Sequence, residues 1–106
     1  MDAVEEIRTA ATRLRETAER TSRAPWSTNG MWVMGADSHI AHFGGHLPNR
    51  DWVALAHPGL AEPLAAWLEE VADDAEKHAR GGWGNSADEI ACGWPLAVAR
   101  LINGSD

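Results

Sequence analysis

The chain has 106 residues, of which 44% are hydrophobic and 24% charged, and its formal net charge at pH 7 is −7. These values are typical of one globular domain, so we expect a single domain over residues 1–106 and exclude a long disordered chain. Cys92 is the single cysteine, which excludes an intrachain disulfide. The acidic start does not resemble a signal peptide, and no apolar run reaches the roughly 20 residues of a membrane span. We therefore expect a cytoplasmic protein that contacts no membrane.

Residues 3–22 carry the first periodic pattern. The apolar residues recur at intervals of three and four, which predicts the buried stripe of an amphipathic helix: Val4, Ile7, Ala11, Leu14 and Ala18. Ala24-Pro25 ends this helix, because the residue before a proline is pushed out of the helical region.

Residues 26–43 predict a small antiparallel sheet. Asn29-Gly30 is typical of a hairpin turn, since both residue types tolerate a positive φ angle. The strand candidates are residues 26–28, 31–34 and 38–43, with a second turn at 35–37. Such a sheet is marginal by itself, so we expect it to pack on a helix.

The second half of the chain predicts helical segments broken by prolines and glycines. Asn49 is a candidate N-cap for a short helix that His57-Pro58-Gly59 ends, and a histidine in that position usually caps the helix. The longer helix that follows has an apolar stripe of Leu64, Trp67, Leu68, Val71 and Ala75. A capping box at 86–89 and a segment over 96–102 complete the pattern. The predicted fold class is α+β: an N-terminal amphipathic helix, a two- to three-stranded antiparallel meander and about three helical segments packed on it.

Three segments carry a family resemblance. They are residues 56–60 with the Leu/Ala/Trp-rich helix at 64–69, the Pro-Trp turn at 23–26, and the Ala/Leu-rich helix at 95–101. In this order the chain resembles small uncharacterised proteins of actinobacteria and their phages or prophages. It departs from their pattern at Ala24 and Trp52. The resemblance implies a phage or prophage origin and no known activity.

His39, His42 and His46 form a candidate metal site. Neutral imidazoles bind zinc, nickel and copper, so these three residues support an alternative function as a metal-binding protein or metal-dependent hydrolase. In a regular strand, residues three apart point to opposite faces, so His39 and His42 should diverge. A site would then need His46 with Asp51 or His57. The other interpretation is that the three are surface histidines.

The remaining candidates for chemistry are weaker. The acidic run at 69–74 is similar to magnesium-binding helices, but its spacing indicates a solvated face. Cys92 has the neighbours of a small buried hydrophobe rather than of an activated thiolate. Phosphate-binding loops, nucleophile elbows and dinucleotide fingerprints are absent from the sequence. The sequence thus argues against an enzyme and predicts no cofactor.

Charge placement bears on partners. No basic patch is visible, so we do not expect direct binding to nucleic acid. Residues 62–89 hold eight acids against Lys77 and Arg80, which supports a third hypothesis: an acidic decoy of a nucleic-acid-binding protein.

Six tryptophans in 106 residues are the most unusual feature of the composition. Trp67 lies on the stripe of the longest helix and is predicted to be core. Trp83 lies between glycines in a polar loop, where it is either an interface anchor or a ring buried by the folded-back loop. The leading hypothesis is a non-enzymatic protein that acts by protein–protein interaction, with an unknown partner and with self-association left open.

Overall fold

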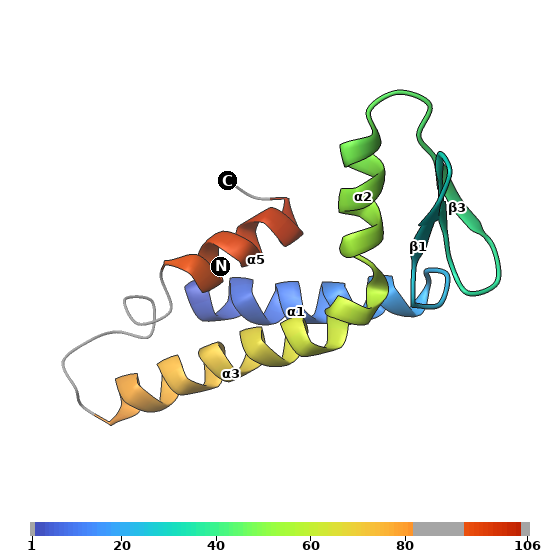
Figure 1. The fold of residues 1–106 in the computed structure, drawn as a ribbon. Coiled ribbons are helices and arrows are strands. Elements are labelled where there is room, and N and C mark those ends of the chain that lie inside the picture. Colours follow the sequence, from blue (N-terminus) through green and yellow to red (C-terminus); the bar gives the residue numbers. More distant parts are fainter. Residues whose placement is uncertain (1, 82–92, 105–106) are drawn as a thin grey trace. The chain divides into compact units, whose positions relative to one another are not determined.

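The computed structural model describes residues 2–81 and 93–104 (Figure 1). Its elements in chain order are α1 (Ala3–Glu19), β1 (Ser27–Asn29), β2 (Trp32–Met34), β3 (His39–His42), α2 (Leu47–Leu55), the 3-10 turn η1 (Pro58–Leu60), α3 (Ala61–Arg80) and α5 (Trp94–Asn103). A helix, a three-stranded antiparallel sheet and further helices follow one another, which confirms the predicted α+β class. None of the helices in the described ranges has the length and apolar character that crossing a membrane requires.

The chain divides into two compact units. The helical unit comprises Met1–Glu16 and Glu62–Asp106, and the sheet unit comprises Thr17–Ala61. That both belong to one cooperative domain, as the composition indicates, stays a prediction. The capping box at 86–89, Trp83 and Cys92 lie outside the described residues.

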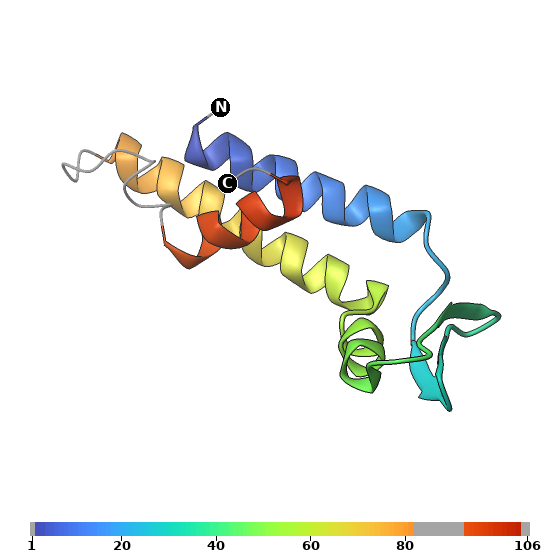
Figure 2. The ribbon, with the colours of Figure 1, turned by 90° about the horizontal axis from the view of Figure 1, so that it is seen from above.

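The helical unit is built around a core of small and medium apolar side chains. Figure 2 shows α1 and α3 side by side, with α5 against them. The buried residues that form this core are Ala3, Val4, Ile7, Ala10, Ala11, Ala65, Leu68, Ala72, Ala75, Leu96 and Ala99. The predicted stripe of α1 is confirmed at Val4, Ile7 and Ala11.

The buried stripe of α3 differs from the predicted one. Trp67 is 38% exposed, whereas its neighbour Leu68 is 0% exposed. Ala65 and Ala72 lie on either side of Leu68 along the helix and are also fully buried. Alanines let two helices approach closely, so the contact is centred on the alanine-rich side of Leu68 and the bulky indole stays at its edge. The prediction that Trp67 is a core residue is therefore wrong.

Arginines of α1 hold the acidic face of α3. Arg8 Nη2 lies 2.8 Å from Asp73 Oδ1, and Arg8 Nη1 lies 2.5 Å from Glu76 Oε1. Arg15 pairs with Glu62 at 2.8 Å and also with Glu69. Hydrogen bonds from the guanidinium groups lower the pKa of Glu76 and of Glu62 below the ordinary glutamate value. The acidic run predicted to face only water is thus partly an interhelical contact.

These pairs predict acid sensitivity of the helical unit. Folding lowers the pKa values of Glu62 and Glu76. The two ionised carboxylates therefore add to the free energy of unfolding above their ordinary pKa of 4.5, and this stabilisation is lost as the pH falls through their pKa values in the folded protein. We expect the melting temperature to fall below that pH, and to fall less steeply in Arg8→Met and Arg15→Met. The measurement is thermal unfolding by circular dichroism between pH 7 and pH 3. Arg23→Met is the control, and identical acid profiles in all four proteins would show that the pairs contribute nothing.

The sheet unit contains the predicted meander. Its strand order is β1-β2-β3, and Asn29 lies opposite Trp32 across a turn in which Gly30 has a φ angle of 59°. The predicted hairpin is confirmed, but its two-residue turn is Gly30-Met31 rather than Asn29-Gly30, because Asn29 is the last residue of β1 and has no positive φ angle. Val33, at 0% exposed, is the one large side chain of this unit that is fully buried among the described residues.

Helix α2 begins at Leu47 rather than after Asn49. His46 is its N-cap without a side-chain hydrogen bond, and a proline lies in its first turn. Proline favours that position because the missing N–H would be unpaired there anyway. The Arg50 guanidinium donates to the carbonyl oxygen of Gly30, which ties α2 to the tip of the β1-β2 hairpin.

Candidate functional site

His39 and His42 lie on the same face of the sheet, contrary to the expectation for a regular strand. His42 is paired with Trp32 and His39 with Met34, while Ile40 between them is the extra residue of a β-bulge. Trp32 and Met34 are two residues apart and share a face, so their partners share it as well. The Trp32 ring meets both imidazoles edge-on, with centroids 4.7 Å and 4.9 Å away.

The third histidine does not complete a metal site with these two. His46 is exposed at the start of α2. Across the described ranges, no three histidine, cysteine, aspartate or glutamate side chains are grouped in a way that could hold a metal ion. The structure thus places His39 and His42 on one face against the same Trp32 ring, without His46, and the metal hypothesis stays a prediction.

His57 has a structural task in the turn before α3. Its Nδ1 accepts a hydrogen bond of 3.0 Å from the Gly59 N–H. A Cβ at position 59 would lie 2.4 Å from His57 Cε1, so glycine is the residue that fits beneath the imidazole. The His57-Pro58-Gly59 sequence is thus explained as the N-cap of η1, whereas Ala56 is the C-cap of α2.

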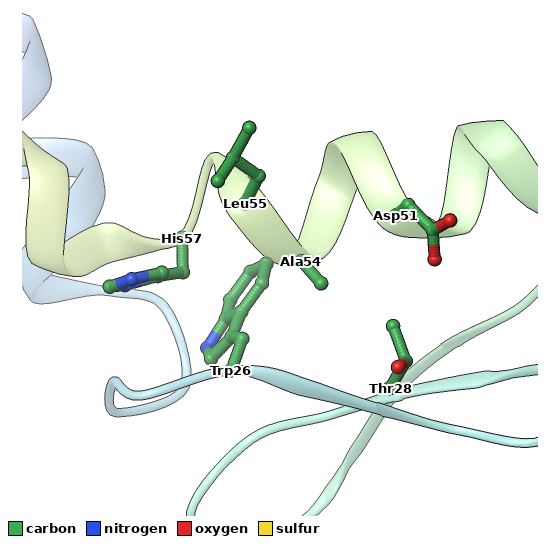
Figure 3. A pocket seen from close by; sticks show the side chains of 6 residues that line it. All are labelled: Trp26, Thr28, Asp51, Ala54, Leu55 and His57. Atoms are coloured by element: carbon green, nitrogen blue, oxygen red, sulfur yellow. The ribbon is translucent and has the colours of Figure 1, made fainter.

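An open groove lies between β1 and α2 within the sheet unit (Figure 3). Its volume is about 360 Å³, and it is lined by Trp26, Thr28, Asp51, Ala54, Leu55 and His57. In Figure 3 the Trp26 ring rises from the strand toward the end of α2, and the Asp51 side chain points from α2 toward Thr28. The groove therefore has an aromatic end and a polar end.

The polar groups of the groove are partly engaged. Trp26 Nε1 donates to the Ser22 carbonyl oxygen at 3.1 Å, which fixes the indole. Arg50 donates to Asp51 Oδ1 from Nε at 2.9 Å and from Nη2 at 2.7 Å. The second oxygen of Asp51 and the Thr28 hydroxyl make no hydrogen bond within the described residues. A ligand group in the groove would thus meet hydrogen-bond acceptors beside an indole.

The outer side of α2 exposes two large apolar side chains. Trp52 is 68% exposed and Leu55 is 66% exposed, three residues apart on one side of the helix. No residue of α2 is buried. Leu55 also lines the groove, so the two features are continuous. We call Asp51, Trp52 and Leu55 the α2 face.

The sequence interpretation singled out Trp83 for an interface and missed the α2 face. Trp83 lies outside the described residues, so its role stays a prediction. In the sequence, Trp52 stands out only as a departure from the family pattern. A nine-residue helix gives too few repeats to tell a buried stripe from an exposed one, and only the sequence Arg50-Asp51-Trp52, with its charges next to the indole, indicated a solvent-facing side.

Comparisons of this chain with protein-family models, with curated proteins and with solved structures find no match.

Proposed function

We propose that this chain is a non-enzymatic protein-binding module, and that the α2 face with the adjoining groove contacts the partner. One observation carries the proposal: Trp52 and Leu55, side by side on a helix with no buried residue, are 68% and 66% exposed. Tryptophan is the residue type most enriched among side chains that dominate binding energy. Exposed apolar groups that adjoin a groove are typical of contact surfaces for other proteins.

The partner's chemistry follows from the groove and from the charge of the chain. The groove offers the indole of Trp26 together with acceptors on Asp51 and Thr28, which suit a side chain with an apolar stem and a donating head, such as lysine or arginine. The formal net charge of −7 lies in the helical unit, so it attracts basic partners to the chain as a whole and not to the groove itself. The proposed partner is therefore a protein segment that carries basic and apolar residues.

Two other functions have less support. The acidic-decoy hypothesis needs free carboxylates along α3, yet Asp73 and Glu76 are held by Arg8, and Glu62 and Glu69 by Arg15. The metal-binding hypothesis has two imidazoles that contact the same Trp32 ring, and the described residues contain no group of three ligands. An accessory role in a phage or prophage is part of our proposal and rests on the resemblance of the chain alone.

A displayed library of random peptides tests the proposal without a known partner. The full chain is immobilised, the enriched peptides are synthesised, and their dissociation constants are measured by fluorescence anisotropy. We expect enrichment of peptides with basic and apolar residues. Trp52→Ala and Leu55→Glu should each weaken their binding at least about tenfold, because a central interface tryptophan contributes more than about 2 kcal/mol.

Met31→Glu is the matched control. Met31 belongs to the same unit and is 50% exposed, but it lies at the hairpin turn and outside the α2 face. Its substitution should leave peptide affinity within twofold. Equal affinity of the enriched peptides for the parent chain, Trp52→Ala and Leu55→Glu would overturn the proposal, as would a library that yields no binding peptide.

A further inference from the structure

Helix α5 carries a second exposed apolar stripe. Trp94 is 82% exposed and Leu101 is 83% exposed, the two highest values among the exposed large hydrophobic side chains of the described residues. They are seven residues apart, so they lie on one side of the helix two turns from each other. Ala97 is exposed between them and Val98 is half-buried. We call these four residues the α5 stripe.

The opposite side of α5 is fixed within the helical unit, so Trp94, Ala97 and Leu101 of the α5 stripe point outward, while the half-buried Val98 also packs against the core. Leu96 and Ala99 are buried in the core with α1 and α3. Asn103 Nδ2 donates to the Glu6 carbonyl oxygen at 2.9 Å, and Arg100 Nε lies 3.4 Å from Glu6 Oε2. Rotation of α5 to bury Trp94 and Leu101 would break all of these contacts.

The α5 stripe is free of carboxylates in an acidic surrounding. In the sheet unit three acids are matched by three arginines, so the helical unit carries the whole formal charge of −7. Helix α5 contains no acid, and its single charged residue, Arg100, is paired with Glu6. Two copies of the chain can therefore bring their α5 helices together without charge repulsion between carboxylates of the two helices.

The order of residues in the α5 stripe is self-complementary. When two copies of α5 cross antiparallel about a two-fold axis between Ala97 and Val98, Trp94 of one copy lies opposite Leu101 of the other, at both ends. The small Ala97 at the crossing lets the helix backbones approach closely. Parallel pairing would instead place indole against indole and leucine against leucine. The antiparallel arrangement instead packs a Trp94 indole against a Leu101 side chain at each of the two ends.

We infer that the α5 stripe is the interface of a homodimer, with the two α5 helices antiparallel. Two tryptophans bring on the order of 400 Å² to this contact, about a third of the roughly 1,200 Å² of a stable interface. The dimer should therefore be reversible and form in the micromolar range. It is independent of the α2 face, which lies in the sheet unit.

Sedimentation velocity over about 1 to 500 µM protein tests this inference, because a small interface dissociates within that range. The parent chain should shift from the mass of a monomer toward twice that value. Trp94→Lys alone and Leu101→Glu alone should remain monomeric at every concentration. Circular dichroism melting checks that both variants are folded, and Leu55→Glu, which changes only the α2 face, should dimerise like the parent.

Mixing the two α5 variants distinguishes the antiparallel arrangement. In a mixed dimer the new ammonium group at position 94 of one copy faces the new carboxylate at position 101 of the other, and the second end keeps the native Trp94–Leu101 contact. The equimolar mixture of Trp94→Lys and Leu101→Glu should thus recover dimerisation. A parent chain that is monomeric throughout, or a mixture that stays monomeric when the parent dimerises, would overturn the inference.

Discussion

Replacing Leu68 by alanine is expected to cost about 2–5 kcal/mol of the free energy of unfolding, a large share of the roughly 5–15 kcal/mol of a domain. Leu68 is 0% exposed and is one of the largest fully buried side chains of the described residues. The core around it is dominated by alanines, including Ala10, Ala72 and Ala75, and these have no flexible side chain to fill the cavity. Urea denaturation followed by circular dichroism at 222 nm measures the loss.

Trp67→Ala is the matched control for this prediction, since it removes a larger side chain from the neighbouring position. Trp67 is 38% exposed, so part of its surface is already in water and its removal leaves an open notch rather than a closed cavity. We expect a clearly smaller loss than in Leu68→Ala. The reverse ranking would show that the buried stripe of α3 is centred on Trp67, as the periodicity alone suggested.

The elements that sequence reasoning predicted well are those with a local physical cause. The stripe of α1 follows from helical spacing, and Val4, Ile7 and Ala11 are indeed buried. The hairpin follows from Gly30, which tolerates the positive φ angle that the turn requires, although the turn is Gly30-Met31 rather than Asn29-Gly30. These features depend on residues close in sequence, so no tertiary information was needed.

The features that sequence reasoning missed depend on neighbours distant in the chain. The extra residue at Ile40 that aligns His39 with His42 is defined only by pairing with β2. The pattern of α3 left both Trp67 and Leu68 on the predicted stripe, and the alanines of α1 decide between them. The exposure of Trp52 and Trp94 likewise depends on which faces of α2 and α5 are covered. Hydrophobicity alone does not carry that information.

A charge placed in the core of the sheet unit is expected to unfold that unit while the helical unit stays folded. Val33 is 0% exposed in the middle strand, and Val33→Asp places an unpaired carboxylate there. Burying such a charge costs more than about 4 kcal/mol. A three-stranded sheet with one short helix has little core to offset that cost. We expect the sheet unit to unfold.

The helical unit should survive this change, because its core is formed by its own helices, with Ile7, Leu68 and Leu96 among the buried residues. Two-dimensional ¹H–¹⁵N NMR spectra report the units separately: amide signals of residues 20–60 should collapse to the random-coil region while those of α1, α3 and α5 keep their dispersion. Met31→Asp adds the same charge at a position that is 50% exposed, and should leave the whole spectrum dispersed. Loss of all dispersed signals in Val33→Asp would instead show that the 106 residues form one cooperative domain, as their length and composition indicate.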